Sequence, residues 1–310
     1  MRTLVAAPGR PGGIELREVE DPSPADGVAV VEVRACSLNR GECTALLSAE
    51  DGWRPGWDVA GVIAEPALDG SSPTSGTRVL AWVNGGGWAE RVPVRSGHLA
   101  PIPDEVSFET ASTLPVAGLT ALGVLALGGP LEGSSVAITG AAGGVGRFVV
   151  QLAHDAGARV TAVVGSPERE RGLRELGADE VVVGLDPEGP VFDLILESAG
   201  GSSLAAALGR VSPDGTVVTF GNSSNEPTTF DTRGFYRRGR PTLRGYLVTH
   251  ELLEGRLGTA GIARLVELVS SGRLRVEVGL EVPWNEAAVA VTAVLERRVR
   301  GKAVLTLGAS

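Results

Sequence analysis

The sequence is poor in several residue types that mark particular classes of protein. Its 310 residues include 2 cysteines and 3 histidines, and only 4% are aromatic. Cys36 and Cys43 are too few for a disulfide framework or a four-ligand zinc site, so we expect a reducing, cytoplasmic environment. The histidines, at positions 98, 154 and 250, lie too far apart to form a helix-borne metal pair. The sequence therefore predicts no metal site.

Long apolar runs and an excess of positive charge are also missing. Residues 111–131 come closest to a run of about 18 apolar residues, but glycine and proline interrupt them. The amino terminus starts with a strand-like segment at 3–5 and lacks a signal-peptide profile. With 28 basic and 37 acidic residues, the net charge is −9. We therefore expect no membrane span, and no nucleic acid or anionic membrane as a partner.

Glycine (44 residues) and proline (19) are abundant, and they divide the chain into short elements. Apolar segments at 28–33, 59–63 and 77–83 predict strands of a partly open β-barrel. Further along, strands and helices alternate, which predicts a parallel sheet with right-handed crossovers. The strands are expected at 135–139, 160–164, 181–183, 194–196 and 217–220, and the helices at 108–128, 147–154 and 167–176. The tail predicts helices at 259–271 and 285–298 and a closing strand at 302–307.

A glycine-rich turn that follows an apolar strand and opens a helix is the most specific signal. It reads Gly140-Ala141-Ala142-Gly143-Gly144-Val145-Gly146. The missing side chains let backbone approach a pyrophosphate, and the helix N-terminus offers free N–H groups and partial positive charge. We therefore predict a dinucleotide site, with Gly140, Gly143, Gly144, Val145 and Gly146 binding the cofactor.

The turn after the next strand decides between the two nicotinamide cofactors. NAD sites usually place a carboxylate there for the ribose hydroxyls. This chain has Ser166 and Arg169, with Arg171 as a further candidate, and these side chains suit a 2′-phosphate. Glu168 lies close enough to weaken this reading, and the segment is alternatively a solvated helix start. The sequence favours NADP(H).

Short motifs in a fixed order along the chain carry a family likeness. They occupy residues 33–42, 55–61, 114–121, 140–146, 176–179, 198–201, 220–224 and 301–305. Each motif is weak alone, but their order and spacing are specific and cover nearly the whole chain. Together they resemble the medium-chain dehydrogenase/reductase superfamily, in its zinc-free, quinone-oxidoreductase-like branch.

The resemblance implies an α/β fold with two domains. A GroES-like, partly open β-barrel domain would take residues 1–111 and 246–310 and hold the substrate. A Rossmann domain with a doubly wound parallel sheet, residues 112–245, would bind NADP(H). The cofactor would lie in the cleft, and a homodimer is expected because such relatives often pair their Rossmann sheet edges.

The chain departs from the zinc-dependent members of this superfamily at two positions. It has Asn39 where they carry a catalytic cysteine and Trp57 where they carry a histidine, and Cys36 lies too early to replace the first ligand. The four-cysteine structural lobe is absent as well. The resemblance therefore implies metal-free hydride transfer to a quinone or an α,β-unsaturated carbonyl.

The same resemblance assigns three catalytic positions. Asn39 would orient or polarise a group at the nicotinamide or substrate. Arg40 would be a charge partner, or else a surface residue pairing with Glu42 or Asp58. Asp58 matches the acidic position beside the missing histidine and is expected to line the cleft.

Further cofactor and substrate contacts follow from matching positions. The cofactor-binding residues outside the glycine turn are Asn39, Thr120, Ser198, Ala199, Phe220, Gly221 and Asn222. Trp53 and Trp57 would wall an apolar pocket for a flat ring, unless both pack within the barrel domain. Tyr246 is a pocket candidate too, with simple packing as its alternative.

Three functions remain open at this point. The first is an NADPH-dependent, metal-free reductase of small-molecule quinones or enones. The second is the same chemistry on an enoyl thioester or a biosynthetic enone, for which arginines at 233, 237, 238, 240 and 244 would offer a basic patch. The third is an NADPH-binding protein with a structural or regulatory role. We expect the first.

Overall fold

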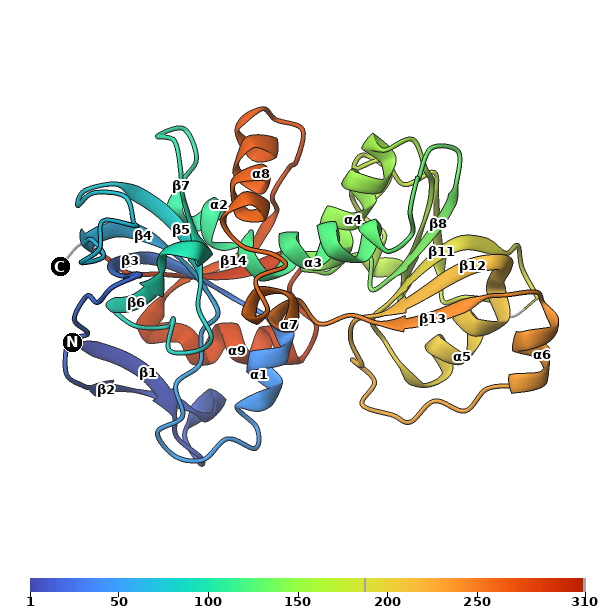
Figure 1. Cartoon of the computed structure of the whole chain (residues 1–310). Helices are drawn as coiled ribbons and strands as arrows, with labels where there is room; N and C mark the ends of the chain where they lie inside the picture. The colour runs from blue at the N-terminus through green and yellow to red at the C-terminus, as the bar shows by residue number, and fades with distance from the viewer. Residues whose placement is uncertain (187, 309–310) are drawn as a thin grey trace. The chain divides into compact units, whose positions relative to one another are not determined.

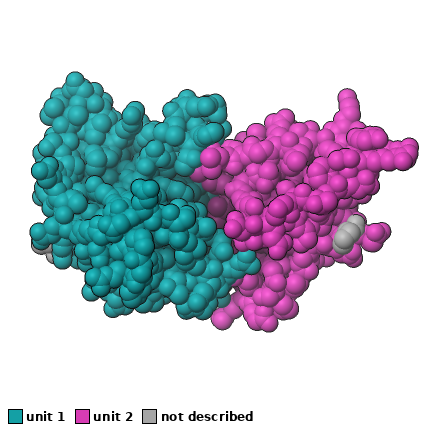
Figure 2. Space-filling model, turned by 90° about the horizontal axis from the view of Figure 1, so that it is seen from below, with its two compact units in different colours: residues 1–119, 249–310 teal, residues 120–248 magenta. Residues whose placement is uncertain are grey.

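The computed structural model describes residues 1–186 and 188–308. The chain forms two compact units, Met1–Leu119 with Thr249–Ser310, and Thr120–Val248, which Figure 2 colours separately. The first boundary falls inside helix α3 (Pro115–Ala126), later than the expected one at residue 111. Helix α2 (Phe108–Ser112) precedes it and packs on strands of the first unit.

A seven-stranded sheet forms the centre of the first unit (Figure 1). Its main path runs β14-β15-β3-β4-β5-β7, and β6 also pairs with β3. The long strand β3 pairs with β6 through its first half and with β15 through its second, so the sheet curls around a core of aliphatic side chains and Trp88. The strands are β3 (Val28–Leu38), β4 (Asp58–Glu65), β5 (Arg78–Trp82), β6 (Arg91–Arg95), β7 (Leu99–Pro101), β14 (Val278–Pro283) and β15 (Lys302–Thr306). This is the GroES-like barrel.

Smaller elements complete the first unit. Strands β1 (Arg2–Ala6) and β2 (Ile14–Glu18) pair as a separate antiparallel ribbon. The helices are α1 (Arg40–Ala45), α7 (Val248–Leu253), α8 (Thr259–Ser270) and α9 (Ala287–Leu295). Helix α1 starts directly after β3 and contacts α9, which places the end of β3 beside the carboxyl-terminal part of the chain.

Six parallel strands form the sheet of the second unit, in the order β10-β9-β8-β11-β12-β13. In chain order this is the 3-2-1-4-5-6 arrangement of a Rossmann sheet, whose ligands bind where the order reverses, between β8 and β11. Helix α4 (Gly144–Asp155) covers one face and α5 (Gly201–Arg210) the other (Figure 1). The strands are β8 (Ser135–Thr139), β9 (Arg159–Val164), β10 (Glu180–Val183), β11 (Phe192–Glu197), β12 (Val211–Thr219) and β13 (Thr242–Gly245); a short helix α6 (Thr232–Arg237) precedes β13.

Two predicted helices differ in the structure. The helix expected at 108–128 is divided into α2 and α3, because Pro115 disfavours helical geometry at the residue before it. The helix expected at 167–176 is wrong: only a 3₁₀ turn, Pro167–Arg169, forms, and turns follow it. Gly172 adopts a positive φ of 81°, which interrupts a right-handed helix. Within the described residues, no helix combines the length and apolar character needed to cross a bilayer.

Candidate active site

The glycine turn lies at the carboxyl end of β8, beside the point where the strand order reverses. Gly140 has a φ of 65°, and a Cβ built there would lie 2.7 Å from Oγ of Ser198. A Cβ at Gly146 would lie 2.5 Å from Cα of Ala141. Gly143 is the N-cap of α4 and makes no side-chain hydrogen bond there, so the first N–H groups of the helix can donate to a ligand. This cradle fits a dinucleotide pyrophosphate.

A buried carboxylate that the sequence reasoning missed organises the neighbouring strand end. Glu197, the last residue of β11, is fully buried and accepts hydrogen bonds from the backbone N–H groups of Ala199 (2.9 Å) and Gly200 (3.0 Å). The hydroxyls of Thr139 (3.1 Å) and Ser203 (2.9 Å) donate to it as well. Glu197 therefore ties the ends of β8 and β11 to the start of α5. The signal that could have identified Glu197 is in the sequence: it is a single acidic residue at the end of an apolar strand.

Several predicted cofactor residues converge at these strand ends. Ser198 donates through Oγ to the carbonyl of Thr139 (3.1 Å) and accepts through its own carbonyl from the N–H of Ser223 (3.1 Å). A Cβ at Gly221 would lie 3.0 Å from that same carbonyl oxygen. Ala199, Phe220 and Asn222 belong to the same two segments, whereas Thr120 lies on α3. The structure thus brings the segments after β8, β11 and β12 together.

The turn after β9 holds the residues predicted to choose the cofactor. Ser166 is half-buried, and its hydroxyl bonds the carboxylate of Glu168, which lowers the pKa of Glu168. Arg169 is half-buried and Arg171 exposed. An ionised carboxylate therefore shares the hydroxyl that was predicted to bind the 2′-phosphate.

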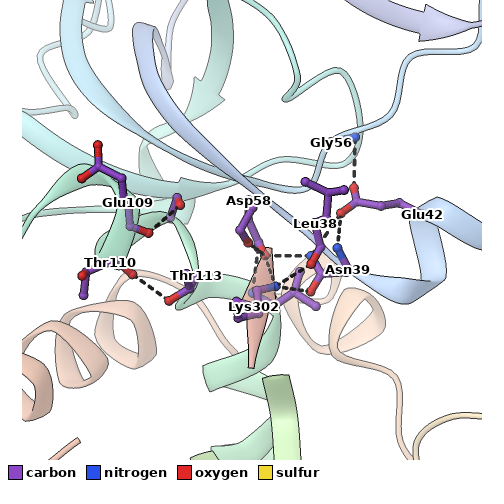
Figure 3. Close-up of polar contacts among 12 residues, drawn as sticks. Leu38, Asn39, Glu42, Gly56, Asp58, Glu109, Thr110, Thr113 and Lys302 are labelled. Atoms are coloured by element: carbon purple, nitrogen blue, oxygen red, sulfur yellow. Dashed lines mark hydrogen bonds and ion pairs between the residues drawn. The ribbon is translucent and has the colours of Figure 1, made fainter. Parts of the chain in front are cut away.

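A second polar cluster lies in the first unit, around the end of β3 (Figure 3). The side-chain nitrogen of Asn39 donates to Oδ2 of Asp58 (2.7 Å) and to Oε1 of Glu42 (3.2 Å). Glu42 also accepts from the backbone N–H groups of Asn39 (2.7 Å) and Gly56 (3.1 Å). Because both amide hydrogens of Asn39 are used, the geometry favours its orienting role over polarisation of a substrate carbonyl.

Asp58, which was expected to line the cleft, is a fully buried residue. Its Oδ2 accepts from the hydroxyl of Ser37 (2.9 Å) in addition to Asn39, and its Oδ1 accepts from the N–H of Val116 (2.8 Å) at the start of α3. The ammonium of Lys302 lies 3.4 Å away. The carboxylate thereby joins β3, β4, β15 and α3.

Burial shifts the titration of the groups around this carboxylate. Burial, reinforced by the charge of Asp58, raises the pKa of Glu42 to about 8. Desolvation also raises the pKa of both buried thiols, Cys36 and Cys43, so they stay protonated at neutral pH. Sequence reasoning missed Lys302 and gave Glu42 only as a partner for Arg40. The signal for Lys302 was its residue type, because it is the chain's only lysine.

The other predicted site residues have mainly structural contacts. Arg40 donates to the carbonyls of Val294 and Leu295 (both 3.1 Å) in the last turn of α9. Trp53 packs against the barrel core, and the ring of Trp57 covers Gly41 of α1. The hydroxyl of Tyr246 lies where a Cβ of Gly123 would be. Catalytic or pocket roles for these side chains stay predictions.

The chain is similar to several known proteins in sequence and in structure. Residues 144–260 match the family model of zinc-binding dehydrogenases. The chain is 30% identical to a quinone oxidoreductase of Pseudomonas aeruginosa over 327 residues, which cover 98% of each protein. It is similar to NorB, a polyketide synthase system protein of Streptomyces orinoci, with 32% identity over 91% of this chain and 13% of that protein. A mycobacterial structure complexed with NADPH superimposes with a TM-score of 0.90 at 23% identity, covering 99% of this chain and 100% of that one.

The matched family is described as zinc-binding, so the question is whether the chain's residues can supply the ligands that zinc requires. In the part of the chain that the structure describes, no group of three or more His, Cys, Asp or Glu side chains could hold a metal ion. Where the zinc-dependent pattern calls for a cysteine and a histidine, the chain offers an amide and an indole, and Lys302 places an ammonium 2.7 Å from Oδ1 of Asn39. These residues do not fit a zinc ion, which prefers thiolate and imidazole ligands.

Proposed function

Because the chain belongs to the quinone-oxidoreductase branch of the medium-chain dehydrogenase/reductase superfamily, we propose that it is a metal-free, NADPH-dependent reductase of quinones or α,β-unsaturated carbonyls. The glycine cradle at the reversal of the Rossmann strand order is the single observation that carries this proposal. It fits a dinucleotide phosphate, and the mycobacterial relative of similar fold is complexed with NADPH. The residues around Asn39 do not fit a zinc ion, which supports a reaction without a metal.

Each part of the chain has a distinct task in this proposal. The N–H groups at the start of α4 bind the pyrophosphate, and Ser166 with Arg169 bind the 2′-phosphate. When bound, NADPH supplies a hydride, so the acceptor gains two electrons, NADP⁺ is released, and the resulting oxyanion or enolate takes a proton from water. Asn39 orients the reacting groups from a network whose other members are buried.

A quinone or an enone suits a site without a metal. Its negative charge is delocalised as it accepts hydride, so modest hydrogen-bond donors stabilise it. A simple ketone would localise that charge on one oxygen and would require a Lewis acid or a strong acid.

The similarity to NorB favours a second candidate, reduction of an enoyl thioester or a biosynthetic enone. The chain corresponds to only 13% of NorB, so it matches one part of a much larger protein. Arg233, Arg237, Arg238, Arg240 and Arg244 would then face an acidic carrier. We further propose that the protein is a cytoplasmic homodimer, and light scattering of the purified protein tests the dimeric state.

The experiment follows NADPH absorbance with ortho- and para-quinones, short enones and an enoyl-CoA, with NADH run in parallel. Turnover of quinones or enones that persists in chelator and prefers NADPH supports the proposal. Turnover of enoyl-CoA alone favours the second candidate. Binding of NADPH without turnover of any acceptor would contradict both and leave a structural or regulatory role.

A further inference from the structure

The only lysine of the chain is buried beside Asn39. The other 27 of its 28 basic residues are arginine, whereas position 302 carries lysine. Lys302 opens β15, and its side chain is 4% exposed. Its ammonium donates to the carbonyl of Leu38 (3.0 Å) and to Oδ1 of Asn39 (2.7 Å), and lies 3.4 Å from Oδ2 of Asp58 (Figure 3).

This arrangement of acceptors requires an ammonium group. An ammonium is compact and has three N–H groups in tetrahedral directions, which can reach three acceptors converging from different strands. A guanidinium is a planar fork suited to one carboxylate or phosphate and needs more room. A chain that otherwise uses arginine for its positive charges therefore has a steric and geometric reason for lysine here.

Lys302 also fixes which way the amide of Asn39 points. In the observed orientation, the amide oxygen accepts from the ammonium, and the amide nitrogen donates to Oδ2 of Asp58 and to Oε1 of Glu42. A rotated amide would set its N–H groups against the ammonium and its oxygen against Asp58 and Glu42. Each lost bond would leave a buried polar group unsatisfied.

The amide of Asn39, held in this orientation, can make one more hydrogen bond. Among the described residues, both N–H groups of the amide are used and Lys302 uses one lone pair of Oδ1, so the second lone pair can accept a further hydrogen bond. The nicotinamide half of the cofactor carries donors, in its carboxamide and its ribose hydroxyls. We propose that Lys302 is a positioning residue that holds Asn39 as a hydrogen-bond acceptor for the nicotinamide half of the cofactor. This inference rests on the proposed function, because it takes NADPH as the ligand.

The first test compares two ligands on the variant Lys302→Met, which removes the ammonium but keeps a similar length. We expect the Kd for NADPH to rise about tenfold, equivalent to about 1.4 kcal/mol. The Kd for 2′,5′-ADP, which lacks the nicotinamide half, is expected to stay within about twofold. An equal loss for both ligands would indicate general structural damage and overturn the proposal.

A double-mutant cycle then asks whether Lys302 acts through Asn39. In an Asn39→Ala background, Lys302→Met is expected to cause no further change in the Kd for NADPH, because the acceptor is already missing. Additive losses would overturn the proposal. Arg300→Met is the matched control, since Arg300 lies just before β15 and pairs with Glu277 at the surface. It should leave both affinities unchanged.

A measurement on the unmutated protein covers the case in which the variants do not fold. Labelling with ¹⁵N-lysine gives a single side-chain ammonium signal, because the chain has one lysine. The signal is expected to shift on saturation with NADPH and not with 2′,5′-ADP; an unchanged signal with NADPH overturns the inference. If the effects of Lys302→Met and Asn39→Ala on the Kd for NADPH are not additive but no acceptor is turned over, only the proposed reaction is refuted. If acceptors are turned over but the two effects are additive, only this inference is refuted.

Discussion

The ammonium of Lys302 lies 2.7 Å from the amide oxygen of Asn39, although 263 residues separate them in the chain. The contact exists because β15, the last strand, pairs antiparallel with the end of β3. The polar cluster around Asn39 is therefore complete only when both ends of the chain have folded into one sheet. Asp58, from β4, supplies the charge that balances the ammonium.

Loss of the Asp58 carboxylate should strongly destabilise the first unit. Asp58→Ala leaves a buried ammonium without its counter-charge and the N–H of Val116 without its acceptor, so we expect a loss of about 3–5 kcal/mol. Urea denaturation measures it. Asp104→Ala is the control, because Asp104 is 98% exposed in its pair with Arg78 and should cost under about 1 kcal/mol. Equal effects of the two variants would contradict this account.

Stability should fall as the pH rises from about 4.5 to about 8. The pKa of Glu42 is raised to about 8 in the folded protein, against an ordinary value of 4.5. Between these values the folded state keeps a proton that the unfolded state has lost, so deprotonation favours unfolding, on the order of a few kcal/mol. Above pH 8 this contribution stays constant.

Urea midpoints measured from pH 5 to pH 9 test this dependence. Glu42→Gln cannot titrate and should lose this part of the slope, whatever its absolute stability. A profile parallel to that of the unmutated protein would show that Glu42 is not the titrating group.

A methyl group at Gly146 should abolish cofactor binding. The Cβ of Gly146→Ala would lie 2.5 Å from Cα of Ala141 and equally close to the carbonyl oxygen of Gly140, so the cradle would have to open. NADPH titration by protein fluorescence measures the loss. Gly209→Ala, on α5, has open space around its Cβ and should bind NADPH normally and gain about 0.5–1 kcal/mol of stability. Normal NADPH binding by Gly146→Ala would refute the assignment of this turn.

Removing the charge of Glu168 should increase the preference for NADPH over NADH. The carboxylate of Glu168 accepts a hydrogen bond from the hydroxyl of Ser166 and would repel a 2′-phosphate. Glu168→Gln removes this repulsion and makes the hydroxyl available to the phosphate. We expect the ratio of the two Kd values to shift several-fold toward NADPH, and the shift to shrink at high salt. Glu170→Gln, two residues further along, is the control. A shift toward NADH would mean that the 2′-phosphate does not bind at this turn.

The sequence alone predicted the Rossmann sheet and its glycine turn. Strand 135–139 and the helix that follows it are local patterns, set by apolar runs and by the conformational freedom of glycine, and these need no distant contacts. The helix expected at 167–176 was wrong because the pattern of charged and apolar residues suggested a helix, whereas Gly172 interrupts it. The burial of Glu197 was missed as well, although a single acidic residue at the end of an apolar strand was a signal for it.

Only the tertiary structure decided the chemistry around Asn39. The family likeness pointed to Asn39 and Asp58, but their polar contacts include Lys302 and Glu42, which no local pattern marks as partners. Electrostatic interactions act through space, and burial strengthens them by removing water. The sequence therefore determined which elements form, while strand pairing between distant segments decided which polar groups meet and which of them carry charge.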